Sequence, residues 1–350
     1  MTETQPVRPG EEIGTDRLES YLSDALGRQG SLTVSQFPAG SSNLTYLVEF
    51  GDDDFVLRRP PFGNTVRSAH DMRREFDVLS KLSAVYRPAP KSVLFCEDES
   101  VIGSEFYLME RRRGLIIRGR SPDILESSPE LQYSVAKSFV RNLADLHSIN
   151  YNAAGLGGLG RPEGYPHRQV EGWTKRYVAA KTDDHSALDS AIEWLNDNIP
   201  TESGATLVHN DYKFDNVMLD PDDLTWVTAV LDWEMVTVGD PLMDLGTTLG
   251  YWMSAGEGEA MLNMPFNPRV LMENISRSEL AKMYADASGR DTTNILYYYV
   301  FGTFKIAVIC QQIYARYVKG STKDQRFAGF DSIVGSLGQF ARKAIDRGHI

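Results

Sequence analysis

Apolar and polar residues alternate with the period of a β-strand in several short runs of the first third of the chain. Residues 32–37, 44–50, 55–58 and 105–110 all show this pattern, and each predicts a strand. Before them, residues 15–26 carry leucines and a tyrosine at helical spacing, which predicts an amphipathic helix. The first part of the chain is therefore expected to form a small antiparallel sheet.

The apolar spacing of the remaining chain is mostly helical. Residues 129–147, 280–287, 295–317 and 327–345 repeat their apolar positions every three or four residues. The most apolar run, 295–310, is broken by a glycine and a lysine and is shorter than a membrane span, so it predicts a buried helix. The composite is an α+β chain with no membrane segment.

A polar cluster interrupts two short apolar runs in the middle of the chain. Leu207 and Val208 lead into it, residues 217–219 leave it, and a turn at 221–223 returns the chain along 226–231. This hairpin is expected to bring three polar side chains to one end of a small sheet: Asp211, Asn216 and Asp232. Two oxygen ligands and a further carboxylate that can act as base suit a magnesium-assisted phosphoryl transfer.

A buried acidic position is predicted on the helix that follows the first strands. Ser68 and Asp71 have the spacing of a capping box, which predicts a helix that continues to about residue 82. Glu75 lies on the apolar stripe of this helix, so it needs a cationic partner. Arg58 is the expected partner, with pairing of Glu75 to Arg73 or Arg74 as the alternative, and a solvent position is expected for the next strand residue, Arg59.

Two basic segments stand out in an acidic protein. The formal net charge of the chain is -12, yet residues 155–181 carry more basic than acidic side chains, and arginines also cluster at 111–120. Such patches favour an anionic ligand. A solvated helix face remains the alternative for each of these cations.

The overall charge and the cysteine content narrow the class of protein. A net charge of -12 disfavours a nucleic-acid partner. The two cysteines lie far apart without metal-site spacing, and the polar, acidic N-terminus is unlike a signal peptide, so a cytoplasmic location is expected. With 350 residues, the chain is long enough for two lobes.

The motifs in the middle of the chain carry a family resemblance. The pattern His-x-Asp-(x)4-Asn at 209–216, followed by Asp232 on a strand, resembles the catalytic core of protein kinases and of the aminoglycoside phosphotransferase/choline kinase families. Leu-Asp-Trp-Glu at 231–234 and Gly-Asp-Pro-x-x-Asp-Leu at 239–245 resemble the small-molecule branch. The basic blocks, together with 58–61, 68–70 and 74–75, resemble the kinase-like domains associated with acyl-CoA dehydrogenases.

This resemblance implies a two-lobed protein-kinase-like fold, with a small antiparallel-sheet N-lobe and a larger, mostly helical C-lobe. Residues 1–14 would be a flexible tail and 15–110 the nucleotide-binding N-lobe. Residues 111–114 would form the hinge. The C-lobe would comprise 115–350 and contain the catalytic hairpin 207–232.

The resemblance also implies a role for particular residues. Asp211 would be the catalytic base, and Asn216 and Asp232 would bind Mg2+. His147 would bond a backbone group, and the ring of His209 would brace the catalytic loop. Residues expected to bind ATP are Gly40, Ser41, Ser42 and Asn43 of a loop over the phosphates, Arg58 in the family's lysine position, Glu75, and the backbone around Glu110 and Arg112. Residues expected to contact the acceptor are Arg161, Arg168, Trp173, Lys175 and Arg176.

The expected activity is the ATP- and Mg2+-dependent phosphorylation of a hydroxyl on a small molecule. An anionic acceptor such as a hydroxyacyl-CoA is favoured, with a possible functional link to an acyl-CoA dehydrogenase. Antibiotic phosphorylation, phosphorylation of choline or a sugar, and a non-catalytic nucleotide-binding role stay open as alternatives. A protein kinase is disfavoured, because Gly-Asp-Pro follows the strand-borne Asp232 and no Ala-Pro-Glu motif does.

Overall fold

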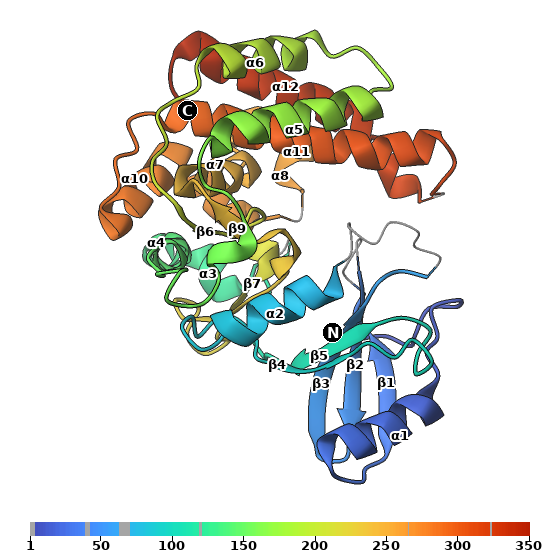
Figure 1. Cartoon of the computed structure of the whole chain (residues 1–350). Coiled ribbons are helices and arrows are strands. Elements are labelled where there is room, and N and C mark those ends of the chain that lie inside the picture. The colour runs from blue at the N-terminus through green and yellow to red at the C-terminus, as the bar shows by residue number, and fades with distance from the viewer. Residues whose placement is uncertain (1–3, 39–42, 63–70, 119–120, 265, 323) are drawn as a thin grey trace. The chain divides into compact units, whose positions relative to one another are not determined.

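The chain forms two compact units. The computed structural model describes residues 4–38, 43–62, 71–118, 121–264, 266–322 and 324–350. One unit consists of Met1–Arg113 with Ala229–Glu234, and the other of Gly114–Thr228 with Met235–Ile350 (Figure 1). The first is built on a sheet and the second is mostly helical, so the sequence patterns assign each region to the correct structural class.

The first unit contains one five-stranded antiparallel sheet in the order β1-β2-β3-β5-β4. Its elements are α1 (Thr15–Leu26), β1 (Leu32–Gln36), β2 (Leu44–Phe50), β3 (Asp53–Arg59), α2 (Met72–Leu82), β4 (Ser92–Cys96) and β5 (Phe106–Glu110). The helix at 15–26 and four of the strands were predicted. The strand β4 was not, because only its last residue is fully buried and its pattern is irregular.

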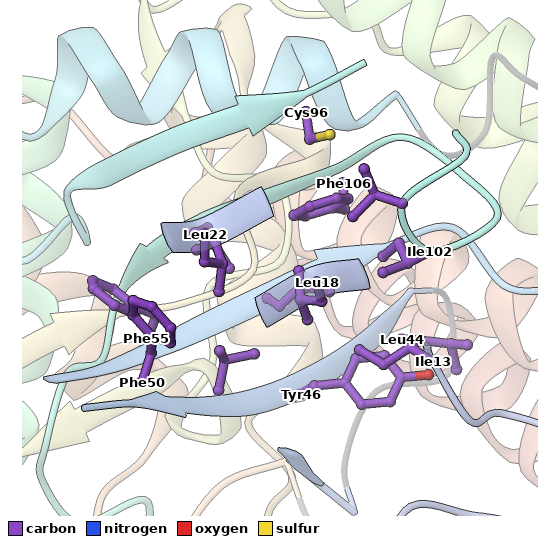
Figure 2. Close-up of a cluster of buried hydrophobic side chains, with 14 residues drawn as sticks. Ile13, Leu18, Leu22, Leu44, Tyr46, Phe50, Phe55, Cys96, Ile102 and Phe106 are labelled. Carbon is purple, nitrogen blue, oxygen red and sulfur yellow. The ribbon is translucent and has the colours of Figure 1, made fainter. Parts of the chain in front are cut away.

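One face of this sheet packs on α1. Side chains two apart on a strand share a face, and Tyr46, Phe50 and Phe55 join one buried cluster with Leu18 and Leu22 of α1 (Figure 2). Full burial of an aliphatic side chain contributes about 1.5–3 kcal/mol. The helix therefore holds the sheet through its leucine stripe, as the spacing predicts.

The alternation along β3 separates its two arginines. Leu57 faces the α1 cluster, so Arg58 faces away from it and Arg59 faces toward it. Arg59 is 2% exposed and donates a hydrogen bond to the carbonyl oxygen of Ile102 at 2.8 Å. The expected solvent position of Arg59 is therefore wrong, because an odd-numbered strand position here is an inward one.

The helix α2 begins one turn later than the spacing indicates. Asp71 is its N-cap, and the carboxylate of Asp71 accepts a hydrogen bond from the amide of Arg74. The residue expected to cap it, Ser68, lies outside the described residues. The inward stripe is as predicted, with Glu75 buried beside Val78, and this helix contacts β4 and β5.

The second unit is a stack of helices with short strands. Its elements are α3 (Asp123–Ser127), α4 (Pro129–His147), α5 (Tyr165–Ala180), α6 (Ser186–Asp197), β6 (Thr206–Val208), β7 (Val217–Leu219), β8 (Val227–Val230), β9 (Thr237–Gly239), α7 (Pro241–Tyr251), α8 (Glu259–Leu262), α9 (Arg269–Asn274), α10 (Arg277–Ser288), α11 (Ile295–Val318) and α12 (Phe330–Arg347). The strand β6 pairs with β9, and β7 pairs with β8 in the predicted hairpin. The last two residues of β8, Ala229 and Val230, already belong to the 229–234 segment of the first unit.

The helices α7 and α11 cross at unusually short range. A side chain on Gly246 would collide with the backbone of Tyr298, and one on Gly302 would collide with the backbone of Gly246. Only glycine lets the two backbones approach this closely. The crossing buries α7 along its whole length. Within the described residues, no helix is both long and apolar enough to span a lipid bilayer.

Candidate active site

The loop after β6 is held in place by one buried carboxylate. Asp244 of α7 accepts hydrogen bonds from the backbone amides of His209 at 2.6 Å and Asn210 at 2.7 Å. Burial raises the pKa of Asp244, but hydrogen bonding and charge from His147, with the charge of His209, outweigh it and hold that pKa below its usual value. The second Asp of the Gly-Asp-Pro-x-x-Asp segment thus anchors the loop.

The residue before Asp211 has a left-handed backbone. Asn210 has φ of 68°, a conformation that non-glycine residues adopt only with support from their surroundings. That support is complete: its side chain accepts from Tyr165 at 3.2 Å and donates to the carbonyl oxygen of Met235 at 3.0 Å, and its own carbonyl accepts from the ammonium of Lys305. These bonds fix the direction in which Asp211 leaves the loop.

The two histidines of this region have structural contacts. The ring of His209 accepts a hydrogen bond from the amide of Asp211 at 3.3 Å, which confirms that it braces the loop. The ring of His147 lies 2.7 Å from the hydroxyl of Tyr284 and 3.2 Å from the carboxylate of Asp244. The expected backbone partner of His147 is therefore wrong, because a tyrosine and an aspartate side chain reach it first.

The carboxylate of Asp211 is surrounded by donors. Its Oδ1 accepts from the hydroxyl of Tyr251 at 2.7 Å, while its Oδ2 accepts from Asn216 at 2.9 Å and forms an ion pair with Lys213. Burial raises the pKa of Asp211, but the charge and hydrogen bond of Lys213 and the hydrogen bond of Tyr251 outweigh it and lower that pKa. Asp211 is therefore a well-ordered anion at neutral pH.

Asn216 is turned so that its amide oxygen points away from Asp211. Its Nδ2 donates to both the backbone oxygen and the Oδ2 of Asp211, each at 2.9 Å. The remaining atom of the amide is an oxygen, the ligand type that Mg2+ requires. The predicted association of Asp211 with Asn216 is thus present within the second unit.

The first unit contains a separate charged cluster around Arg58. Its guanidinium forms an ion pair with Glu75 at 2.6 Å, both side chains being buried, as predicted. Burial raises the pKa of Glu75, an effect that the charge of Arg58 opposes. The alternative partners are engaged elsewhere: Arg73 pairs with Glu97, and Arg74 donates to the backbone of residue 234.

The guanidinium of Arg58 lies within ion-pair distance of three carboxylates. Arg58 also lies 3.3 Å from Asp232 and 3.6 Å from Glu234, so negative charge exceeds positive charge around it. Asp232 has φ of 67° and a side chain that is 36% exposed. Excess carboxylate charge with an accessible oxygen fits a hard divalent cation.

A protein-only metal cage is absent from the described part of the chain, where no group of three or more His, Cys, Asp or Glu side chains could hold a metal ion.

The other residues expected to bind nucleotide divide into three groups. Gly40, Ser41 and Ser42 lie outside the described residues. Asn43, the last residue of that loop, is buried and donates to Glu234 at 2.9 Å. The side chains of Glu110 and Arg112 bond to each other at 2.8 Å, and they also contact the backbone near residues 89–91.

The basic segment 161–176 is partly self-satisfied. The guanidinium of Arg168 donates to the carbonyl oxygens of Arg161 and Glu163, so it stabilises a turn. Lys175 pairs with Glu171 at 2.6 Å on an exposed helix face, which is the predicted alternative for this lysine. Trp173 is buried at 5% exposure beneath the guanidinium of Arg176, which lies 4.4 Å from its ring centre.

Four residues of these clusters were not found from the sequence: Lys213, Glu234, Tyr251 and Lys305. The signal for Lys213 was available, since it lies two residues after Asp211 in the same loop. Glu234 likewise belongs to the Leu-Asp-Trp-Glu motif. Tyr251 and Lys305 come from α7 and α11, whose approach depends on the glycine crossing, so no local pattern indicates them.

The chain is similar in sequence to known proteins along most of its length. The profile of the Phosphotransferase enzyme family matches residues 33–271. Acyl-CoA dehydrogenase family member 11 of Pongo abelii is 35% identical over 343 residues, covering 95% of this chain and 43% of the relative. Family member 10 of Mus musculus is 32% identical over 348 residues, covering 97% of this chain and 32% of the relative. The chain therefore spans less than half the length of these relatives.

Solved structures agree on the fold. A Ralstonia eutropha protein designated a candidate aminoglycoside phosphotransferase is 30% identical, with a TM-score of 0.78 over 96% of this chain and 99% of that one. Choline kinase of Cryptosporidium parvum aligns with a TM-score of 0.63 at 13% identity over 91% of each chain. The fold is kinase-like, with an antiparallel sheet in the N-terminal region and helices in the C-terminal region.

Proposed function

The chain belongs to the phosphotransferase enzyme family, and we propose that it transfers the γ-phosphoryl group of ATP to the hydroxyl of a hydroxyacyl-CoA. The observation that carries the proposal is the environment of Asp211. A buried carboxylate with a lowered pKa, oriented by Lys213, Tyr251 and Asn216, suits a group that aligns a hydroxyl for attack.

Asp211 would accept the hydrogen bond of the acceptor hydroxyl. The hydroxyl oxygen then forms a bond to the γ-phosphorus, the bond from that phosphorus to the ADP oxygen breaks, and the hydroxyl proton passes to the Asp211 carboxylate. A low pKa makes Asp211 a weak base in the ground state, so its main contribution is orientation. Lys213 places a positive charge beside the same carboxylate. This charge would partly neutralise the negative charge of the phosphates.

Asn216 and Asp232 would provide the oxygen ligands of Mg2+, and Arg58 would bind the phosphates that precede the transferred group. When bound, Mg2+ neutralises the charge that develops on the phosphate oxygens. The buried ion pair with Glu75 fixes the guanidinium in one position. Arginine can bridge a carboxylate and a phosphate with its fork of donors, so its presence where similar kinases carry a lysine is compatible with this role.

The nature of the acceptor is inferred from the relatives and from charge. The relatives are named acyl-CoA dehydrogenases, so a CoA thioester is an acceptor that could be produced or consumed beside such an enzyme. The site region contains Lys213, Lys305 and Arg176, which favour an anionic substrate. An aminoglycoside is a polycation and would be repelled by the same residues.

The test is phosphate transfer from γ-labelled ATP in the presence of Mg2+. The acceptors are hydroxyacyl-CoAs with the hydroxyl at different carbons, kanamycin, choline and a hexose. We expect a phosphorylated CoA thioester with the wild type and none with Asp211→Asn. Transfer to kanamycin, choline or the sugar alone would replace the proposed acceptor. Tight ATP binding without transfer to any acceptor would favour a non-catalytic role.

A further inference from the structure

A groove lies between α5 and α11, and one of the residues expected to contact the acceptor, Arg176, lines it. It has a volume of about 460 Å³, within the usual range of small-molecule sites, about 300–1,000 Å³. It is lined by Arg176, Ala179 and Ala180 of α5 and by Gln312, Ala315, Arg316 and Lys319 of α11. Three of these lining residues are small alanines and three are cations.

The charges of this groove have no internal counterpart. Among the described residues, no carboxylate lies within ion-pair distance of Arg176, Arg316 or Lys319, and no acid lines the groove. The neighbouring Lys175, by contrast, forms an ion pair with Glu171. In a chain with a net charge of -12, three cations that line one groove without a carboxylate are suited to an external anion.

The groove is connected to the catalytic loop through one aromatic ring. The guanidinium of Arg176 lies 4.4 Å from the centre of the Trp173 ring, and the ammonium of Lys305 lies 5.6 Å from the same centre. Lys305 also donates to the carbonyl of Asn210, the residue before Asp211. A path of contacts thus leads from the groove to Asp211 within the second unit.

The spacing along α11 gives the length of ligand that this path would take. Residues 305, 312, 316 and 319 recur at helical spacing and so form one stripe, which faces α5. Eleven residues separate Lys305 from Arg316, a rise of about 16 Å. A ligand with its reacting hydroxyl at Asp211 and its anionic end in the groove must therefore be long, with its charge far from the reacting group.

We infer that this groove binds the phosphates of coenzyme A, and that the CoA thioester spans the distance to Asp211, where its hydroxyacyl end would lie. The inference rests on the proposed function. The pantetheine arm supplies the required length, and the diphosphate and 3′-phosphate supply the terminal charge. Arginines match phosphate oxygens with two parallel hydrogen bonds. Choline and aminoglycosides lack both features.

Calorimetry with the whole chain tests the groove. The ligands are CoA, dephospho-CoA and pantetheine, and the variant is the double substitution Arg316→Gln with Lys319→Gln. The matched control removes the same charge from other helices by Lys282→Gln with Arg342→Gln, both exposed and paired with acids. We expect the groove variant to weaken CoA binding on the order of tenfold to a hundredfold, as for lost hydrogen bonds to charged groups. The control should stay within twofold of the wild type.

The competing outcomes are distinct. If the wild type does not bind CoA, or if both double variants weaken binding equally, the groove assignment is wrong. Kinetics separate this failure from that of the proposed function. The groove variant should lower kcat/KM for a hydroxyacyl-CoA relative to the matching hydroxyacyl-pantetheine. If the enzyme is active but the ratio of the two kcat/KM values is the same in the groove variant and the wild type, only the groove assignment is wrong. If CoA binds in a groove-dependent way but no phosphoryl transfer occurs, only the proposed reaction is wrong.

Discussion

The Asp211 cluster of the helical unit and the Arg58 cluster of the sheet unit are organised in opposite ways. Asp211 is one carboxylate surrounded by three side-chain donors. Arg58 is one guanidinium approached by three carboxylates. The first arrangement is complete in itself and orients a single group. The second carries surplus negative charge, so it is suited to receive a cation. In the proposed reaction, different parts of the fold would therefore align the acceptor and neutralise the phosphate charge.

The sharpest way to break this comparison is to neutralise one carboxylate from each cluster. Asp211→Asn should lower kcat on the order of 10²–10⁴ while the affinity for ATP stays within about twofold, because the group acts on the acceptor. Asp232→Asn should instead weaken the binding of Mg2+ and ATP. Steady-state kinetics and calorimetry measure the two effects, with Asp223→Asn in the β7–β8 turn as the control. Equal loss of ATP affinity in both variants would contradict the division.

Removal of the buried acid tests whether the Arg58 cluster is a structural unit. Glu75→Gln should lower the free energy of unfolding by about 3 kcal/mol, since breaking a buried ion pair leaves a charge poorly compensated. Urea denaturation measures it. The control is Glu97→Gln, whose partner Arg73 is exposed, and its effect should stay below about 1 kcal/mol. A similarly small effect for both variants would show that Asp232 and Glu234 compensate the charge of Arg58 without Glu75.

The pH dependence of stability tests the buried ammonium beneath the catalytic loop. Burial lowers the pKa of Lys305 from 10.5 to about 8. A lowered lysine pKa favours the neutral form in the folded state, so stability is lost as the pH falls from about 10.5 to about 8. Between pH 7 and pH 9.5 the wild type should gain about 2 kcal/mol from this group.

Urea denaturation at the two pH values should show this gain in the wild type and its loss in Lys305→Met. Lys137→Gln, an exposed lysine of α4, serves as the control and should keep the gain. If Lys305→Met shows the same pH response as the wild type, the ammonium is already charged throughout this range.

The smallest expected effect concerns one of the three donors to Asp211. Tyr251→Phe removes the hydrogen bond to Oδ1 of Asp211 but keeps the ring. A lost hydrogen bond of this kind is worth roughly 0.5–1.5 kcal/mol, which corresponds to a decrease in kcat of about two- to tenfold. The pKa of Asp211 should rise at the same time, shifting the acid limb of the pH–rate profile upward. An unchanged profile would show that Lys213 and Asn216 are sufficient to set the pKa of Asp211 without Tyr251.

Local patterns were enough for much of the architecture. The helix 15–26 was predicted to the residue, and a helix was predicted near 129–147, because apolar residues at helical spacing mark both segments. The ion pair of Arg58 with Glu75 also followed from the sequence, since an acid on an apolar stripe needs a cation. In each case the decisive information lies within a few turns of one element.

The misses share a different cause. The irregular strand β4 lacks the alternation that marks a strand. Arg59 was expected in solvent at a strand end, although it is buried and donates to the carbonyl oxygen of Ile102. Tyr251 and Lys305 reach the catalytic loop only because Gly246 and Gly302 allow their helices to cross closely. Contacts set by packing between distant segments leave no periodic signal in the chain.

That glycine crossing also divides α11 into two parts with different freedom to change. The half near Gly302 packs closely against α7 and carries Lys305. A larger residue at the crossing would push the two helices apart and so displace the loop that Lys305 contacts. The half beyond residue 312 carries Arg316 and Lys319, which line the groove. If the proposed function holds, substitutions in the outer half of this helix would change acceptor preference, whereas substitutions in the inner half would impair phosphoryl transfer itself.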